Sequence, residues 1–589
     1  MASAKAPDPA AGRGWLYDLG AKYIGSEAPP APIVKTVAPP NGFPKSVPVE
    51  VITFTDWSTY IVVPDVQVAR VSNAEEVAAV CNWAAANGTT IRPVGEGHNW
   101  SPLVMAPDTS PNAPSNMDVM LVDTTKLTGC SFAMLGGVPT ATFGTGITID
   151  AATAYLEGLD NGQKDAAPGY ALPQTTAPGN LTLGGILAIG GHGTIVPSRT
   201  DESDLTADLM GSLSNLILAF DAVVTDPLGP DPHTYVVRHF DRADADAAAF
   251  LVHLGRAFLT SVTLRVVPNY YLQLSWRFPS AADLFAPPAK PPSAQSFAGL
   301  LDECGRVEVL WFPYVPMTFV QCNKVQSTKI APQVDGPYNY PWMNDIPAWG
   351  SELIRAALVH EPKLTPMFTL FEWGMSAYHQ DGKPPLNGTA RDLEIYLKDT
   401  TLRVTLFGWA LQLPRVNVQQ AANQFYEQVS TMLQRARAAG HYPINAAMEI
   451  RCTTVDRVGA LPAGAAPPAL AATHSVDPDN SALDTVIWLN LGTITGTPGA
   501  NEFYTELESW IIATWGTQSP NRLRPEWSKA WAYTADGPWT NAATIEAIRD
   551  SYNQSPDRPS TFAWAAATLA SYDGANLFTN PLLRKLFPS

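Results

Sequence analysis

Arg92-Pro93-Val94-Gly95-Glu96-Gly97-His98-Asn99-Trp100-Ser101 is the stretch from which the rest of the chain can be interpreted. The residues before it, Thr89 to Ile91, are typical of a short strand, and Pro93 is expected to end that strand because proline cannot donate to a ladder. The two glycines permit a tight turn that exposes successive N–H groups, an arrangement suited to a pair of phosphates. His98 follows them directly. A plain surface turn of the same composition is the alternative.

A second glycine-rich stretch runs from Ala177 to Gly193. Its six glycines are too many for a stable helix of this length, because each costs roughly 1 kcal/mol relative to alanine in a helix interior. We therefore expect a backbone that lies close against a bound ligand, with N–H groups free to donate. A tightly packed helix or a glycine-rich crossing is the alternative interpretation.

Composition limits the classes of protein to which the chain can belong. Of 589 residues, 46% are hydrophobic and 15% are charged, which favours large buried cores over disorder. The formal charge of −17, without a basic stripe, argues against nucleic acid as a partner. No apolar run reaches the roughly 18 residues of a membrane span. The five cysteines, odd in number and without a CxxC pair, favour neither a disulfide scaffold nor a metal site.

The first half of the chain alternates predicted strands and helices. A helix is expected to begin after Asn73, which can cap it with Glu76 completing a capping box, and to stop at Asn87-Gly88. The other elements expected here are strands at 60–63, ended by Pro64, at 69–71, 120–123 and 140–146, a helix at 147–159, and buried strands within 213–224 and 260–267.

The pattern changes near residue 269, where long loops separate strands from helices. Strands are expected at 307–312 and 403–411, and a long helix is expected from its cap, Asn417, to Ala439, with Gly440 as its stop. The sequence therefore predicts an α+β protein with an N-terminal domain over 1–268, a second domain over 269–530 and a C-terminal segment over 531–589 that returns to the first domain.

Two common phosphate-binding motifs are missing from the sequence. Gly382-Lys383 is followed by Pro384, so there is no Walker loop, and no GxGxxG follows a strand with an acid about 20 residues on. The loop at 92–101 instead resembles the pyrophosphate loop of the vanillyl-alcohol-oxidase family of flavoproteins. The stretch at 182–193 resembles the second flavin loop of that family, and Leu254 to Leu264 resembles the strand that closes its flavin domain.

This resemblance implies the fold and the cofactor. The expected fold is the two-domain FAD-binding fold of this family, with a substrate domain built on a mixed or antiparallel sheet flanked by helices. It implies FAD attached covalently through His98, with an imidazole that only hydrogen-bonds its loop as the alternative, and a backbone role at His192. The implied cofactor-binding residues are Pro93, Val94, Gly95, Glu96, Gly97, His98, Asn99, Trp100, Gly179, Thr182, Leu183, Gly184, Gly185, Gly191, His192 and Gly193.

The second half carries a candidate catalytic strand. Apolar and charged residues alternate from Met448 to Cys452, which predicts a strand with Glu449 and Arg451 on one face. The two side chains could form a structural ion pair or belong to an active site. In sugar-lactone and alditol oxidases of the family, a Glu-x-Arg strand lies over the flavin. The segment 524–529 resembles the Pro-His-Trp-Gly-Lys segment of those oxidases, but Glu526 replaces the histidine and Ser528 replaces the glycine. A polyol or lactone substrate is therefore in doubt.

Over essentially its full length, the sequence resembles the bacterial cholesterol oxidases with covalently bound flavin. That resemblance implies oxidation of a sterol 3β-hydroxyl by oxygen to the ketone, isomerisation to the conjugated 4-en-3-one, and release of hydrogen peroxide. It also implies secretion, transient contact with a membrane surface for sterol uptake, and a monomer. The first residues, Met1 to Lys5, lack the apolar core of a signal peptide, as expected of a processed form.

Five residues are candidates for the chemistry. Glu449 is the expected base, and Arg451 is expected to orient it and to stabilise negative charge. Glu308 is expected to pair with Arg451 and gate the pocket, with a surface carboxylate as the alternative. Lys529 is a candidate for assisting oxygen reduction and Asn490 for holding the hydroxyl; a solvated lysine and a buried core amide are the respective alternatives. A sugar-alcohol or aldonolactone oxidase, or a non-enzymatic flavin-binding sterol carrier, is the alternative function.

Overall fold

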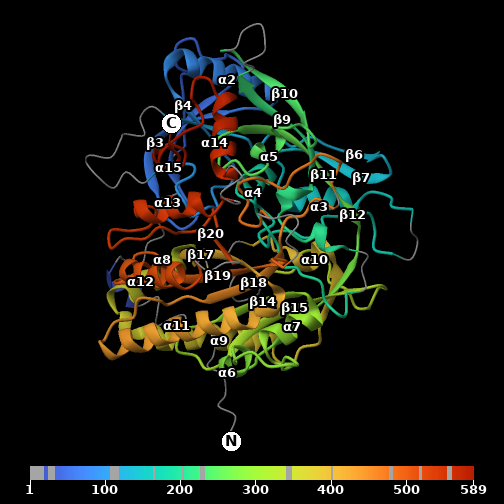
Figure 1. Ribbon diagram of the computed structural model, residues 1–589. Coiled ribbons are helices and arrows are strands. Elements are labelled where there is room, and N and C mark those ends of the chain that lie inside the picture. The colour runs from blue at the N-terminus through green and yellow to red at the C-terminus, as the bar shows by residue number, and fades with distance from the viewer. Residues whose placement is uncertain are drawn as a thin grey trace, which may run out of the picture.

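The computed structural model describes residues 19–23, 34–106, 119–162, 166–201, 205–225, 233–339, 346, 348–398, 402–459, 461–475, 482–516, 521–553 and 560–588. Two five-stranded sheets occupy the N-terminal part of the chain, and one eight-stranded sheet occupies the part after residue 270 (Figure 1). The α+β class expected from the sequence is confirmed.

The first sheet has the strand order β1-β2-β3-β5-β4. Its strands are β1 (Lys35–Val37), β2 (Val49–Thr55), β3 (Val62–Arg70), β4 (Thr90–Val94) and β5 (Val119–Asp123), and β5 runs parallel to both β3 and β4. Helix α2 (Ala74–Asn87) connects β3 to β4. The Asn73 side chain caps it, and Gly88 ends it with a φ of 67°. Glu76 accepts from the N–H of Ser72, one residue before the cap.

Two expectations about proline were wrong. Pro64 lies inside β3, next to an irregularity in its pairing with β2, where a missing N–H costs no regular ladder bond. Pro93 lies inside β4 and does not end it. This strand is at the edge of its sheet, where proline is tolerated because one side of the strand needs no partner.

The second sheet is antiparallel, with the order β10-β9-β11-β7-β6. Its strands are β6 (Cys130–Leu135), β7 (Val138–Gly144), β9 (Ile217–Thr225), β10 (Tyr235–Asp241) and β11 (Phe258–Arg265). The associated short elements are α3 (Ile149–Glu157), α4 (Leu183–Ala188), α5 (Ala247–Phe250) and the strand pair β8 (Tyr170–Ala171) and β12 (Val267–Pro268).

The eight-stranded sheet is antiparallel throughout, with the order β16-β13-β15-β14-β18-β19-β17-β20. Its strands are β13 (Tyr271–Arg277), β14 (Arg306–Trp311), β15 (Thr318–Gln326), β16 (Leu386–Thr389), β17 (Val404–Leu413), β18 (Met448–Thr454), β19 (Thr485–Ile494) and β20 (Arg522–Pro525). The helices of this region are α6 (Ala281–Leu284), α7 (Phe297–Cys304), α8 (Ala348–His360), α9 (Thr365–Gln380), α10 (Ala390–Glu394), α11 (Val418–Ala438) and α12 (Ala500–Ile511).

Helix α11 buries the face expected from its period. Val418, Phe425, Val429 and Leu433 are buried, and Gly440 follows its end with a φ of 81°. The expected cap was wrong, because the Asn417 side chain makes no capping hydrogen bond and its backbone is already helical.

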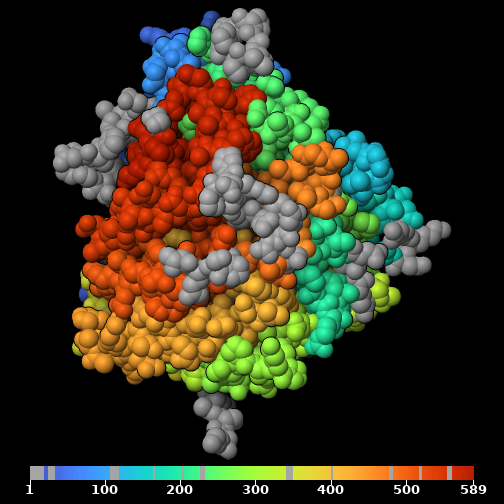
Figure 2. Space-filling view, viewed as in Figure 1, coloured from blue at the N-terminus to red at the C-terminus, as the bar shows by residue number. Residues whose placement is uncertain are grey.

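The C-terminal residues lie against the first sheet. The helices of this segment are α13 (Ala542–Asp550), α14 (Thr561–Ser571) and α15 (Pro581–Leu586) (Figure 1), and Leu577 and Phe578 pack in one cluster with Ile91 of β4. Figure 2 shows the last residues, in red, in the upper part of the molecule. The Ile91 N–H donates to the Leu577 carbonyl oxygen (3.0 Å), and Asn580 Nδ2 donates to the carbonyl oxygens of Pro102 and Leu103 (2.8 and 3.0 Å). The exact domain boundaries stay a prediction.

Candidate active site

Two neighbouring cavities form the candidate site: the larger is lined by both the N-terminal part and the eight-stranded sheet, and the smaller is lined by residues of the N-terminal part alone. The larger has a volume of about 390 Å³ and the smaller a volume of about 140 Å³. The residues that line both cavities are His98, Leu181, Ile186 and Ile189. The two spaces therefore meet beside the histidine.

The loop after β4 forms one wall of the smaller cavity. Its lining residues include the run from Arg92 to Asn99. Gly97 has a φ of 65°, which glycine adopts without strain. Within the described part of the chain, the backbone N–H groups of Gly95, Gly97 and His98 meet no protein acceptor. Unpaired N–H groups beside a cavity are what an anionic phosphate requires.

The second glycine stretch corrects our expectation about glycine and helices. Residues Leu183–Ala188 form α4 even though Gly184 and Gly185 lie inside it. A Cβ at Gly184 would press on Thr145, and one at Gly191 would overlap Ile186, so these two glycines permit close packing of protein on protein. Tertiary packing thus outweighs the propensity cost. Thr182, Gly184 and Gly185 still line the smaller cavity.

The other residues of that stretch divide between the larger cavity and the core. Gly191, His192 and Gly193 line the larger cavity. Leu183 is fully buried, and the Gly179 N–H donates to the Tyr396 carbonyl oxygen (2.8 Å). Neither Leu183 nor Gly179 is among the residues lining either cavity, so the structure does not bring these two to the site.

His98 lies in an aromatic surrounding. Its ring centroid is 4.8 Å from that of Trp57 and 5.7 Å from that of Trp100. Burial, followed by the nearby charges of Lys529 and Arg403, lowers the pKa of His98 to about 3. The imidazole is therefore neutral at physiological pH and keeps one ring nitrogen with a free lone pair.

Across the larger cavity lies a group of two carboxyls and one guanidinium. Glu449 and Arg451 point to the same face of β18, and Arg451 Nε is 2.7 Å from Glu449 Oε1. Glu308 comes from the adjacent β14 and accepts a hydrogen bond from Gln321 Nε2 (2.8 Å). We expected Arg451 to pair with Glu308. This expectation was wrong, because the structure pairs Arg451 with Glu449 instead.

Glu308 holds its proton more strongly than an ordinary carboxyl does. Burial, together with the charge and hydrogen bond of Glu449, raises the pKa of Glu308 to about 8, and Arg451 opposes this only in part. Glu308 therefore keeps its proton at neutral pH. Glu449 remains the carboxylate that faces Arg451.

A second charged group lies on the β17–β19 side of the cavity. Glu526 accepts a hydrogen bond from Asn490 Nδ2 (2.7 Å), and its Oε1 atom lies 3.8 Å from Lys529 Nζ and 3.7 Å from His192 Nε2. Although burial favours its protonation, Lys529, His192 and Arg451 hold the pKa of Glu526 below its ordinary value. Asn490 does not line the cavity, so it acts through Glu526.

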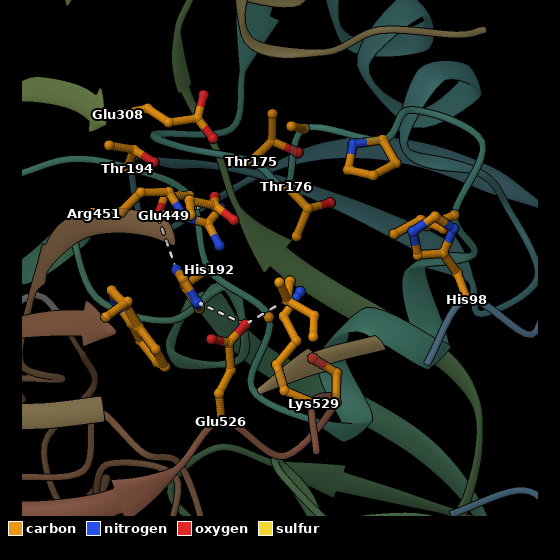
Figure 3. Close-up of a pocket in the computed structure, with 18 of the residues that line it drawn as sticks. His98, Thr175, Thr176, His192, Thr194, Glu308, Glu449, Arg451, Glu526 and Lys529 are labelled. Atoms are coloured by element: carbon orange, nitrogen blue, oxygen red, sulfur yellow. Dashed lines mark hydrogen bonds and ion pairs between the residues drawn. The ribbon is translucent and has the colours of Figure 1, made fainter. Parts of the chain in front are cut away.

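Lys529 and His192 are held by aromatic rings. Lys529 Nζ lies 3.8 Å from the centroid of the Trp100 ring, and burial lowers its pKa. His192 stacks on Trp488 at 3.5 Å between centroids, and its Nδ1 faces the Gly193 carbonyl oxygen at 2.9 Å. Figure 3 shows His98 on one side of the cavity, Glu308, Glu449 and Arg451 on the opposite side, and Glu526 with Lys529 below.

Comparison with known proteins decides the family. A family model described as "Cholesterol oxidase, substrate-binding" matches residues 273–588, and one described as "FAD binding domain" matches residues 66–204. A structure described as a solvent-stable cholesterol oxidase is 35% identical, covers 93% of this chain and 100% of its own, and has a TM-score of 0.85. The chain belongs to the cholesterol oxidase family.

Two further comparisons set the limits of the likeness. The crystal structure of cholesterol oxidase from B. sterolicum is 30% identical, covers 94% of this chain and 100% of its own, and has a TM-score of 0.84. A chitooligosaccharide oxidase with 13% identity and a TM-score of 0.53 shares the fold alone. No match was found among the curated proteins. This cholesterol oxidase family member is a flavin-dependent oxidoreductase with the expected two-domain FAD-binding fold.

The residues at the two cavities fit FAD. The smaller cavity offers the N–H groups of Gly95, Gly97 and His98, which meet no acceptor among the described residues, as a pyrophosphate needs. Where the larger cavity passes Thr175 and Thr176, their buried hydroxyls have no partner, so they are free to bind a polar ring edge. Among the described residues, no group of three or more His, Cys, Asp or Glu side chains is placed to hold a metal ion.

Several site residues escaped the sequence analysis. Glu526 was noticed only as a departure from a related segment, although it is the carboxylate nearest Lys529 and His192. Gln321 could have been found, because it alternates with Phe319 and Asn323 along β15 and all three line the cavity. Glu372, on α9, carries no local signal that distinguishes it from a surface acid.

Proposed function

We propose that this protein oxidises the 3β-hydroxyl of sterols to the ketone with molecular oxygen, releases hydrogen peroxide, and isomerises the product to the conjugated 4-en-3-one. The observation that supports this most is the position of Glu449, Arg451 and Glu308, which lie across the larger cavity from His98 (Figure 3) and line it together with apolar residues such as Leu310 and Phe312. A sterol requires a long apolar pocket with polar groups at the reacting end.

The apolar part of the cavity suits the body of a sterol. Its wall is formed by β14, β15 and β17 and by residues around 446 and 492, and the lining residues are Leu310, Phe312, Phe319, Leu402, Val404, Leu406, Ala446, Ala447 and Gly492. Glu308, Leu310 and Phe312 point to one face because residues two apart share a face of a strand. The carboxyl therefore marks one end of this row and Phe312 the other.

Glu449 is the residue that would accept the hydroxyl proton, while the bound flavin supplies the hydride acceptor. The ion pair with Arg451 fixes the direction of the carboxylate. The protonated Glu308 beside it supplies a hydrogen-bond donor. Because Glu308 is neutral, it does not compete with Glu449 for the positive charge of Arg451. In the isomerisation, Glu449 would take a proton from the carbon between the new ketone and the double bond and return it to the far carbon of that double bond.

Lys529 would hold positive charge close to the point where oxygen is reduced. Its ammonium is buried between Glu526 and the Trp100 ring. A buried cation favours negatively charged products of oxygen more strongly than a solvated one, because the surroundings are of low dielectric.

Replacing Glu449 with Gln tests the assignment of the base. The amide keeps the size of the side chain but cannot accept the hydroxyl proton, so we expect a loss of turnover of about 100-fold or more. The FAD content should be unchanged, as measured by its absorbance. Turnover like that of the unaltered protein would refute the assignment.

We also propose that FAD is bonded through its 8α-methyl carbon to a ring nitrogen of His98. The neutral imidazole and the position of His98 at the junction of the cavities support this. The protein is precipitated with acid and the pellet is examined for yellow flavin. Flavin in the pellet that moves to the supernatant in His98→Ala is expected; flavin in the supernatant of the unaltered protein would contradict the tether.

Sterol supply by transient contact with a membrane surface is part of the same proposal. Met367, Leu370 and Tyr378 are exposed on α9, and Trp349 is exposed on α8. None of the described helices is long and apolar enough to cross a membrane. Co-sedimentation with phosphatidylcholine–cholesterol vesicles should weaken when Met367 and Leu370 are both replaced with Ser. Secretion and a monomeric state are inferred from the family alone.

Oxidation of alditols or aldonolactones is the alternative outcome. Peroxide release is measured with sterols and with sugar alcohols under the same conditions. Release with the sugars alone would replace the sterol proposal, and binding of a sterol without peroxide from any substrate would indicate a carrier.

A further inference from the structure

Helix α9 contributes one carboxyl to the apolar part of the larger cavity. Glu372 lines the cavity and is only 7% exposed. Its Oε2 atom is buried without a hydrogen-bond partner, and among the residues that the structure describes Glu372 has no ion pair and no side-chain hydrogen bond. Glu308, Glu449 and Glu526 all have such partners, so Glu372 is the exception among these four cavity carboxyls.

The position of Glu372 follows from the two hydrogen bonds that join α9 to the region between β14 and β15. The Thr369 hydroxyl donates to the Pro313 carbonyl oxygen (2.7 Å), and Trp373 Nε1 donates to the Thr318 carbonyl oxygen (3.2 Å). Pro313 follows Phe312 in the connection between β14 and β15, and Thr318 begins β15, where it pairs with Trp311 at the end of β14. At about 3.3 Å per residue, Phe312 is about 13 Å along the strand from Glu308. Glu372 therefore lies at the end of the apolar part that is remote from the reacting carboxyls.

A carboxyl in this position is neutral. Burial raises the pKa of Glu372 well above its ordinary value, and no cation of the described residues opposes the effect. A protonated carboxyl donates one hydrogen bond and accepts others. A buried donor left without an acceptor is destabilising, so the site favours a ligand that supplies an acceptor.

We propose that Glu372 is a specificity-determining residue that hydrogen-bonds an oxygen at the end of the steroid remote from its 3-hydroxyl. The class of substrate this selects is a 3β-hydroxysteroid with a ketone on ring D or a hydroxyl on the side chain, in preference to one that ends in hydrocarbon. This proposal rests on the proposed function, which places the 3-hydroxyl of the steroid beside Glu449 and so directs its other end toward Glu372. The ring-D ketone oxygen and the side-chain hydroxyl oxygen can each accept the hydrogen bond that the protonated Glu372 donates.

The test uses binding and turnover together on the FAD-loaded protein. Binding is measured by titration calorimetry with 3-keto steroids, which have no 3-hydroxyl to oxidise and carry a hydrocarbon chain, a ring-D ketone or a side-chain hydroxyl. The variants are Glu372→Met, which keeps the length without a polar group, and Glu372→Gln, whose amide can still donate. Ser376→Ala is the matched control, because its hydroxyl donates to the Glu372 backbone carbonyl and not to the carboxyl.

In the unaltered protein, we expect tighter binding of at least one oxygenated steroid than of the hydrocarbon-ended one. In Glu372→Met, that preference should fall about tenfold or more, since 1.4 kcal/mol corresponds to a factor of ten. Glu372→Gln and Ser376→Ala should retain it. If Glu372→Met loses its binding preference for one of the oxygenated steroids, the oxygen of that steroid is the one that Glu372 recognises.

Two results would overturn the inference. One is an unaltered protein that binds the hydrocarbon-ended steroid most tightly, which needs no variant to be folded. The other is an unchanged preference in Glu372→Met. Peroxide release with 3β-hydroxysteroids is recorded separately: its absence refutes the proposed function, whereas the binding preferences judge the role of Glu372.

Discussion

The larger cavity shows how surroundings give chemically identical side chains different states. Glu308 is beside another carboxyl and keeps its proton, whereas Glu526 is beside Lys529 and His192 and loses it. Glu372 has no charged neighbour that acts on it, and burial alone decides its state. A single residue type thus supplies a donor, an anion and a neutral acid within one cavity.

At the residue scale, we predict that activity depends on the protonation of Glu308. Its pKa of about 8 is raised, so the proton is lost as the pH rises through this value. The new charge then competes with Glu449 for Arg451, and we expect kcat/KM to fall above about pH 8. In Glu308→Gln this inflection should disappear from the pH profile.

The control for this prediction is a carboxyl that does not line the cavity. Arg277, helped by Lys324 and against the effect of burial, lowers the pKa of Glu303 to about 2, so Glu303 is ionised throughout the range. Glu303→Gln should leave the inflection in place. An inflection near pH 8 that persists in Glu308→Gln would assign it to another group.

At the scale of elements, the site depends on the close approach of two glycine-rich segments. A Cβ at Gly95 would overlap the Thr182 hydroxyl, so the loop after β4 and the start of α4 touch where both line the smaller cavity. These segments are more than 80 residues apart, and neither forms the cavity wall alone.

We predict that Gly95→Ala lowers the FAD content of the purified protein about tenfold, because the added methyl group separates the two segments. The content is measured by flavin absorbance per polypeptide. Gly129→Ala, where nothing lies within 4 Å of the added atom, should load FAD normally. Thr182→Ala in the same chain should restore part of the loss, as expected of sites in direct contact. A normal FAD content in Gly95→Ala would contradict this prediction, because it would show that the two segments can move apart without loss of the cofactor.

At the scale of the whole molecule, one buried carboxylate joins the eight-stranded sheet to the C-terminal segment. Glu508 of α12 accepts hydrogen bonds from the N–H groups of Ala532 and Tyr533 (2.7 and 2.8 Å) and from Trp409 Nε1 (3.1 Å). Burial raises its pKa to about 7. Its contribution to stability is therefore greatest below the pKa of about 4.3 in the unfolded chain, and is lost as the pH rises through 7.

We predict that Glu508→Ala lowers the free energy of unfolding by about 3 kcal/mol or more at pH 6, because three buried donors lose their acceptor at about 1–3 kcal/mol each. Urea denaturation measures the change. Glu506→Ala on the same helix removes only the exposed pair with Arg435 and should cost about 1 kcal/mol or less. Equal effects of the two variants would contradict this role for Glu508.

The sequence by itself determined the features that are encoded locally. The caps and apolar period of α2, the buried face of α11 and the shared face of Glu449 and Arg451 all follow from residues a few positions apart. The loop at Gly95 to His98 was also evident, because two glycines before a histidine limit what the backbone can do. Such patterns depend on periodicity and backbone conformation, which neighbouring residues fix.

Only the tertiary structure decided which partner each of these groups meets. It placed Glu449 rather than Glu308 against Arg451, put Asn490 behind Glu526, and left Glu372 Oε2 without a hydrogen-bond partner among the described residues. It also allowed Gly184 and Gly185 to lie in a helix. The physical reason is that burial, charge and close packing between distant segments set these outcomes, and no local pattern records which segments will touch.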